Sequence, residues 1–182
     1  MPSQNFTAAQ AAKQITRILR NPEPGSNPPY SDTSNGNWVE TFGTPITLNY
    51  AFRTSAPGSY PVSNMNGFSA MNAAQQTLVA DALQKWSEVA NISFVPVAEA
   101  QANFLFGNFS GDAGLVNAID GYGGWSASWS QQSGQPRVYT RNSHVWIDST
   151  ATYATAPTLE NGAYHLYQHE IGHAITLGHP GN

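Results

Sequence analysis

The chain has 182 residues, of which 40% are hydrophobic and only 10% are charged, and its formal net charge is −4. This apolar and aromatic content excludes a disordered chain, and the lack of a Lys/Arg cluster argues against nucleic acid or an anionic membrane as a partner. The chain contains no cysteine, so it depends on no disulfide, and it has no apolar run of the ~18 residues that a membrane span needs.

Residues 1–29 predict a short helix followed by a linker. In NFTAAQAAKQITRILR, Thr7 is a suitable N-cap, and apolar residues recur at helical spacing. The four prolines of NPEPGSNPP, residues 21–29, cannot continue a helix. We expect residues 30–182 to form a sheet and further helices, and the whole chain, 1–182, to be one domain.

The middle of the chain predicts strands around one long helix. PITLNYAFR, residues 45–53, alternates apolar and polar residues as a half-buried strand does. FSAMNAAQQTLVADALQKWSEVAN, residues 68–91, predicts a helix with Ser69 as its cap and Asn91 near its end. Its expected apolar stripe contains Leu78, Val79, Ala82, Leu83, Trp86, Val89 and Ala90.

Four further segments predict strands. ISFVPV and ANFLFGNF are the stronger candidates, and GWSASW and SHVWIDS are the weaker ones. The order of helices and strands indicates a mixed sheet with long helices packed on it.

The sequence YQHEIGHAITLGHPGN contains a candidate metal site. Residues 161–174 predict a helix, on which His169 and His173 face the same way, about 6 Å apart, and can bind one metal ion. Glu170 lies about 100° round the helix, so it can reach a water molecule beside the metal without ligating the metal. This is the His-Glu-x-x-His arrangement of zinc metalloproteases, in which the glutamate is the general base for attack of water on a peptide carbonyl.

His179 makes the metal site a stronger prediction. Two histidines and a glutamate on an amphipathic helix also occur as ordinary surface residues, and that motif alone leaves both readings open. His179 follows six residues after His173, at metzincin spacing, and three histidines with one open position form a catalytic zinc ligand set. We therefore expect His169, His173 and His179 to bind Zn²⁺. A helix continued to His179 would place it about 9 Å beyond His173 and about 120° off its face, so the helix must end between them.

These residues resemble the zinc segment of the serralysins, which are secreted alkaline metalloproteases within the metzincins. FSAMNAAQQTLVADALQKWSEVANISF resembles their first long helix and next strand, and ANFLFGNFSGDAG and GYGGWSASW resemble their middle strands. The resemblance covers about residues 38–182. It implies an α+β, zincin/metzincin-like fold with a mixed twisted sheet and two long helices, and zinc endopeptidase activity on protein or peptide substrates.

The resemblance also implies a substrate-binding edge strand and a location. An extended peptide would pair along GWSASW, with an ordinary core or loop strand as the alternative reading. The residues concerned are Gly124, Trp125, Ser126, Ala127, Ser128 and Trp129. The resemblance implies secretion by a type I system, which fits the absence of a signal-peptide pattern in MPSQNFTAAQ.

The chain departs from the family pattern in two places. Thr176 stands where the family has a glycine that turns the chain sharply, and a β-branched residue there would cost roughly 1–2 kcal/mol if it took the left-handed conformation. The family's methionine turn, its tyrosine near the metal and its calcium-binding repeats are expected after Asn182. We therefore expect a fold truncated after the zinc-binding helix, low activity for this chain alone, and the remaining part of the enzyme as a candidate partner on a separate chain.

The departures leave a second function open, namely a non-catalytic module that binds a partner or an extended peptide along its sheet edge. His144 and His165 match no ligand of the family; His144 is expected at a strand start, and His165 is expected to pack or hydrogen-bond. Asp112, Asp120 and Asp148 are candidates to hydrogen-bond a metal ligand or to bind calcium, with solvated turns as the simpler explanation. Calcium is a cofactor of the full-length family that nothing in this chain supports.

Overall fold

The computed structural model describes residues 46–62, 65–111, 120–130, 138–158, 160–175, 177 and 179. The helix and linker expected over 1–29 lie outside the described residues, as do Thr176 and Asp112.

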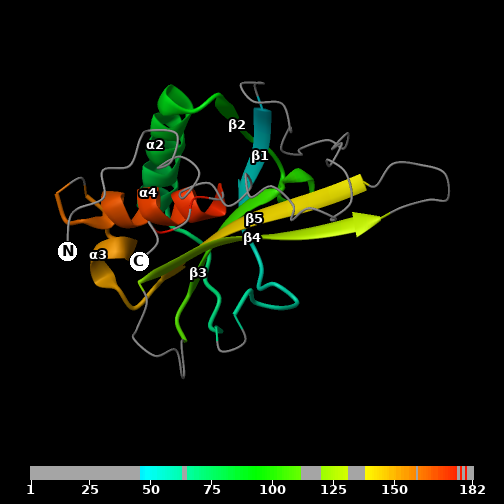
Figure 1. Ribbon diagram of the computed structural model, residues 1–182. Helices are drawn as coiled ribbons and strands as arrows, with labels where there is room; N and C mark the ends of the chain where they lie inside the picture. Colours follow the sequence, from blue (N-terminus) through cyan, green and yellow to red (C-terminus); the bar gives the residue numbers. More distant parts are fainter. Residues whose placement is uncertain are drawn as a thin grey trace, which may run out of the picture.

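Five strands and three α-helices form the described part of the chain (Figure 1). In chain order they are β1 (Ile46–Phe52), α2 (Ala73–Val89), β2 (Ile92–Pro96), the 3₁₀ turn η2 (Glu99–Gln101), β3 (Phe104–Phe109), β4 (Gly121–Ser130), β5 (Val138–Asp148), α3 (Thr152–Thr155) and α4 (Ala163–Ala174). The sheet order is β2-β1-β3-β5-β4, with β4 antiparallel to β5 and the other pairs parallel. The predicted mixed sheet with two longer helices is therefore confirmed.

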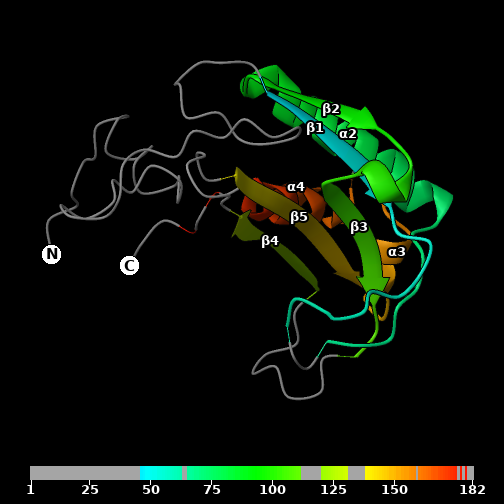
Figure 2. The ribbon, with the colours of Figure 1, turned by 90° about the vertical axis from the view of Figure 1, so that its right-hand side faces the viewer.

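The main core lies between one face of the sheet and the helices α2 and α4, which lie behind the strands in Figure 2. Alternation along β5 places Val145 and Ile147 in this core and turns Trp146 to the opposite face. On that opposite face Trp146 packs with Met65 and Phe109 under the segment that precedes α2. The sheet is thus covered on both faces, which makes it a rigid support for α4.

Helix α2 starts later than the sequence predicted. Its N-cap is Asn72, whose side chain accepts from the Gln75 N–H, while the Gln75 side chain accepts from the Asn72 N–H. Ser69, the expected cap, instead pairs with Asn108 in an isolated bridge. The expected apolar stripe is buried through Leu83, but Val89 is 79% exposed, because the helix ends there and its last turn projects past the core.

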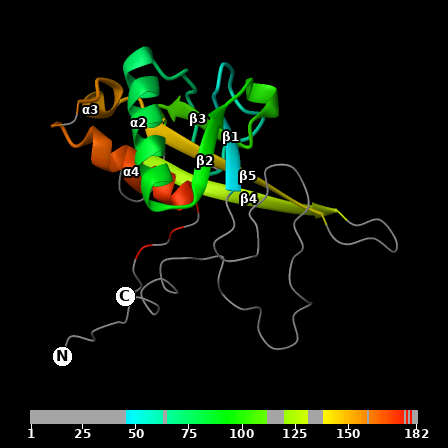
Figure 3. The ribbon, with the colours of Figure 1, turned by 90° about the horizontal axis from the view of Figure 1, so that it is seen from above.

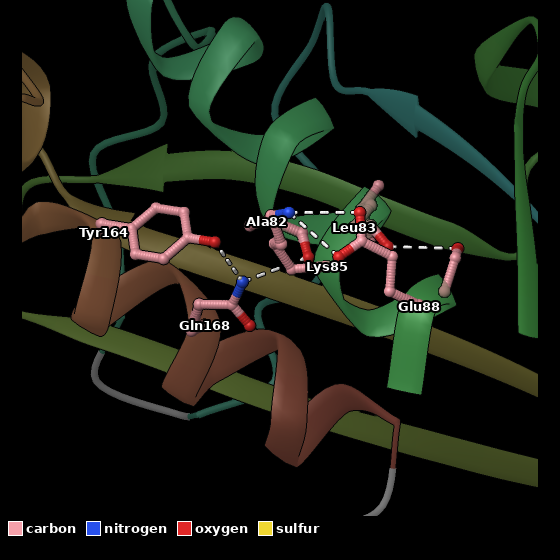
Figure 4. A network of polar contacts seen from close by, with 7 residues as sticks. Ala82, Leu83, Lys85, Glu88, Tyr164 and Gln168 are labelled. Carbon is pink, nitrogen blue, oxygen red and sulfur yellow. Dashed lines mark hydrogen bonds and ion pairs between the residues drawn. The ribbon is translucent and has the colours of Figure 1, made fainter. Parts of the chain in front are cut away.

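Polar side chains tie α4 to α2, and the two helices lie against each other when seen from above (Figure 3). Figure 4 shows Gln168 of α4 donating to the Ala82 carbonyl of α2 at 3.2 Å and to the Tyr164 hydroxyl at 3.0 Å. Deeper in the core, the buried Gln75 amide donates to the Tyr167 hydroxyl at 3.0 Å, and that hydroxyl donates to the Ala154 carbonyl. These bonds fix the rotation of α4 about its own axis.

A membrane-spanning helix is not found among the described residues, since none of their helices is both long and apolar enough.

Candidate metal centre

Helix α4 carries the metal motif and ends where the sequence required. Its last residue is Ala174, and the Leu177 N–H donates to the Gly172 carbonyl at 2.9 Å, a pattern that closes a helix end and reverses the chain. The Ser143 hydroxyl of β5 donates to the Ala174 carbonyl at 2.9 Å. The end of α4 is therefore anchored to the sheet, and the chain turns back so that His179 can reach the ligands on the helix.

The three predicted ligands converge on one point. The Nε2 atom of His173 lies 3.0 Å from that of His169 and 3.0 Å from that of His179, and the remaining side of the triangle is 3.2 Å. Two nitrogens bound to zinc at about 2.0–2.1 Å with a tetrahedral angle are about 3.3 Å apart. The triad fits a zinc ion within a few tenths of an ångström, and among the described residues it is the one group of three such side chains that could hold a metal ion.

The protonation states of His173 and His169 also favour binding of a cation. The Leu177 carbonyl lies 2.9 Å from Nδ1 of His173. A carbonyl only accepts, so Nδ1 carries the hydrogen and Nε2 presents a lone pair to the metal position. Burial, followed by the charges of His173 and His179, lowers the pKa of His169 and favours the neutral imidazole that binds metal.

Glu170, the predicted general base, is 6% exposed and lies against β4. Burial raises the pKa of Glu170 to about 7, although the Gly123 N–H, which hydrogen-bonds the carboxylate, opposes the shift. A carboxyl group with this pKa can accept and release a proton near neutral pH, as general acid–base catalysis requires.

Two glycines of β4 let the strand approach α4 closely. A Cβ atom at Gly123 would lie 1.9 Å from the Glu170 backbone oxygen, and one at Gly121 would lie 2.8 Å from Glu170 Cγ. Sequence reasoning did not single out either residue. The signal was present in GYG, because glycines two apart in a strand lie on one face and mark a close approach of another segment.

Among the described strands, β4 is an edge strand, as predicted. β4 lies at one end of the sheet order and pairs antiparallel with β5 from Gly121↔Ile147 to Ser130↔Val138, so all six residues from Gly124 to Trp129 lie along this edge. Binding of substrate by this edge stays a prediction.

The two histidines outside the triad behave differently from each other. His144 was expected at a strand start, which is wrong: it lies within β5, on the sheet face away from α4, and stacks on Tyr122 with ring centroids 5.8 Å apart. The strand starts earlier because residues 138–142 pair with β4. His165 is exposed on α4, where its ring meets the edge of Tyr164.

Asp120 and Asp148, the two candidate aspartates that lie among the described residues, make local hydrogen bonds. Asp148 accepts from the backbone and hydroxyl of Thr150 in a turn, and Asp120 accepts from the Tyr153 hydroxyl. Neither belongs to the metal-binding group that the structure describes.

Comparison with known proteins agrees with this geometry. Residues 54–182 match the matrixin family of peptidases. The chain is 34% identical over 139 residues to metallopeptidase AprA of Pseudomonas marginalis, covering 75% of this chain and 27% of that protein. It is 29% identical over 181 residues to serralysin G of Dickeya chrysanthemi, covering 98% of this chain and 33% of that protein. It is 35% identical over 179 residues to serralysin C of the same organism, covering 98% of this chain and 32% of that protein.

The chain therefore spans about a quarter to a third of the length of these relatives. The match to the family covers the sheet beyond β1, both longer helices and the histidine triad. On this evidence the chain belongs to the matrixin family of peptidases, and it resembles the serralysins among the metzincins.

Proposed function

We propose that this chain is a zinc-dependent endopeptidase in which His169, His173 and His179 hold the metal and Glu170 is the general base. The observation that carries the proposal is the triangle of three Nε2 atoms, 3.0–3.2 Å apart, of which two belong to the same helix as the buried Glu170 and the third to His179 beyond the helix end. Bound zinc supplies Lewis acidity and makes water more acidic.

Glu170 moves the proton in this proposal. The carboxylate accepts a proton from the attacking water and passes it to the leaving amine. The Gly123 N–H keeps one end of the carboxylate in place. Burial against β4 keeps water away from the rest of the Glu170 side chain, so the side chain does not turn toward solvent.

The substrate in this proposal is an extended protein or peptide segment that adds to β4. An edge strand offers backbone donors and acceptors to such a segment. His169, His173 and Glu170 come from α4, which packs on this strand, so a segment paired with β4 passes beside them. A protein substrate and an extracellular location are further parts of the proposal, and they rest on the resemblance to serralysins.

The test combines metal analysis with peptide hydrolysis. Mass spectrometry of the metal content should give one zinc per chain, and a quenched fluorescent peptide should be cleaved in a reaction that a chelator stops. Glu170→Gln should lower kcat by about 10²–10⁴-fold, the range for loss of a general base. Glu160→Gln is the matched control, because Glu160 is an exposed glutamate just before α4, and its replacement should leave kcat unchanged.

Two outcomes would overturn the proposal. Undiminished cleavage by Glu170→Gln would remove the glutamate from the mechanism. A zinc-loaded chain that binds extended peptides without cleaving them would instead favour the non-catalytic, peptide-binding module.

A further inference from the structure

An acidic residue is held rigidly where β4 begins. The Tyr153 hydroxyl of α3 donates to Asp120 Oδ2 at 2.6 Å, and the Asp120 carbonyl accepts from the Asp148 N–H at 2.8 Å. Asp120 is exposed, whereas Tyr153 is half-buried. The carboxylate therefore faces solvent from a position that is fixed through both its side chain and its backbone.

Asp120 directly precedes the part of β4 that contacts the proposed catalytic base. The next residue, Gly121, is so close to α4 that an added Cβ would lie 2.8 Å from Glu170 Cγ and 3.1 Å from Leu166 Cδ1. Burial raises the pKa of Tyr153 to about 12, and both the Asp120 carboxylate and the charge of Glu170 add to the shift. The Asp120–Tyr153 pair thus lies at the end of β4 that packs on α4, outside the histidine triad.

The negative charge of Asp120 is not neutralised by the basic side chains that the structure describes. Arg53 lies 3.8 Å from Glu99, and Lys85 bonds Glu88 on α2 at 2.9 Å. The hydroxyl of Tyr153 gives Asp120 a hydrogen bond but no positive charge. A positively charged group brought to this end of β4 would therefore meet an available carboxylate.

We propose that Asp120, positioned by Tyr153, is a specificity-determining residue that favours lysine or arginine in the substrate segment paired with the amino-terminal end of β4. This inference rests on the proposed function. A peptide added to an edge strand presents each side chain at a fixed position along that strand. The side chain opposite the start of β4 lies next to Asp120, and a lysine or arginine there gains a charge pair that a neutral residue lacks.

The experiment compares matched peptides with the full chain. A quenched fluorescent peptide carries Lys, Gln or Glu at one position, and this substitution is moved through three residues on each side of the cleaved bond. At the position opposite Asp120, kcat/KM should be about three- to fivefold higher for Lys than for Gln, the upper part of the range for one exposed charge pair. The preference should lie in KM rather than in kcat, and added salt should reduce it.

Variants assign this preference to Asp120. Asp120→Asn should abolish it, so that the Lys and Gln peptides have equal kcat/KM, and Tyr153→Phe, which frees the carboxylate to move, should reduce it. Asp81→Asn removes the same charge from the exposed surface of α2 and should leave the preference unchanged. Equal use of Lys and Gln at all positions, or a Lys preference that survives Asp120→Asn, would overturn the inference.

A binding measurement separates this inference from the proposed function. Fluorescence anisotropy with the zinc-loaded Glu170→Gln chain reports affinity for the Lys and Gln peptides without turnover. Lys-selective binding lost in Asp120→Asn would support the inference even if the wild-type chain cleaves nothing, an outcome that refutes only the proposed function. Cleavage without selectivity refutes only the inference, and absence of both binding and cleavage refutes both.

Discussion

Replacing Gly123 by alanine tests the contact between β4 and α4 directly. The added Cβ would lie 1.9 Å from the Glu170 backbone oxygen and 2.6 Å from its carbonyl carbon. That is about 1.5 Å short of van der Waals contact, and backbone atoms cannot turn away as a side chain can. Overpacking of this kind typically costs 1–3 kcal/mol, and the stiffer unfolded chain of the alanine variant returns less than about 1 kcal/mol. Because the 1.9 Å contact is with backbone, the cost should lie at the upper end of this range, and we expect Gly123→Ala to lower the free energy of unfolding by about 2 kcal/mol.

The strand must also withdraw from Glu170, which should lower activity. A misplacement of about 1 Å near a catalytic group can reduce the rate about 100-fold. Urea unfolding followed by circular dichroism gives the stability, and peptide hydrolysis gives the rate under conditions where the variant is folded. Gly124→Ala is the control in the same strand, because its Cβ would meet only the side chains of His144 and Tyr122, at 3.0 Å, which can move. If Gly123→Ala were as stable and as active as Gly124→Ala, the close approach of β4 to α4 would not be required.

Four further predictions follow from the described contacts and the sequence. Burial, and secondly the charge of Arg53, lowers the pKa of His144 to about 4, so between about pH 6.5 and 4 the unfolded chain binds a proton at His144 that the folded chain does not. The free energy of unfolding should therefore fall by about 3 kcal/mol as the pH drops from about 6.5 to 4. In the His144→Asn variant, the urea midpoint should depend less on pH over that window. Tyr167→Phe leaves the buried amide of Gln75 without one acceptor and should lower the unfolding free energy by about 1–2 kcal/mol in the same assay, whereas an unchanged midpoint would make that bond dispensable. Thr176→Gly should tighten zinc by about 5–30-fold in a chelator competition if threonine is strained there, and equal affinities would exclude that strain. Removal of zinc should lower the melting temperature, and readdition should restore it; a melting temperature that does not depend on zinc would argue against metal binding by the folded chain.

The metal centre was accessible to sequence reasoning because its geometry is mostly local. His169 and His173 are brought together by helical spacing alone, and the same geometry shows that the helix must end before His179. The structure confirms both points. Likewise, alternating apolar residues identify β1 because strand alternation is a local property.

Other features depend on distant contacts that a local pattern does not contain. Ser69 and Asn72 are both good helix caps, and the choice falls on Asn72 because the Gln75 side chain, which completes the capping box, is fixed in the core by Asn108. His144 lies in mid-strand because β5 is extended by its pairing with β4. The role of Gly123 becomes visible only when α4 packs on β4.

The position of the metal ligands along the chain determines when the site can assemble during synthesis. The elements against which α4 packs, including α2, β4 and β5, all precede it in sequence. Since a nascent chain emerges from its amino terminus, these elements leave the ribosome before His169, and His179 is the last of the three ligands to appear. The sheet and α2 are therefore available for packing before any of the three histidines emerges, and α4 then completes the core with Ala163, Tyr167 and Ile171. A metal ion held by the triad would be added to a fold that already has an apolar core, in contrast to small zinc domains, in which the metal itself drives folding.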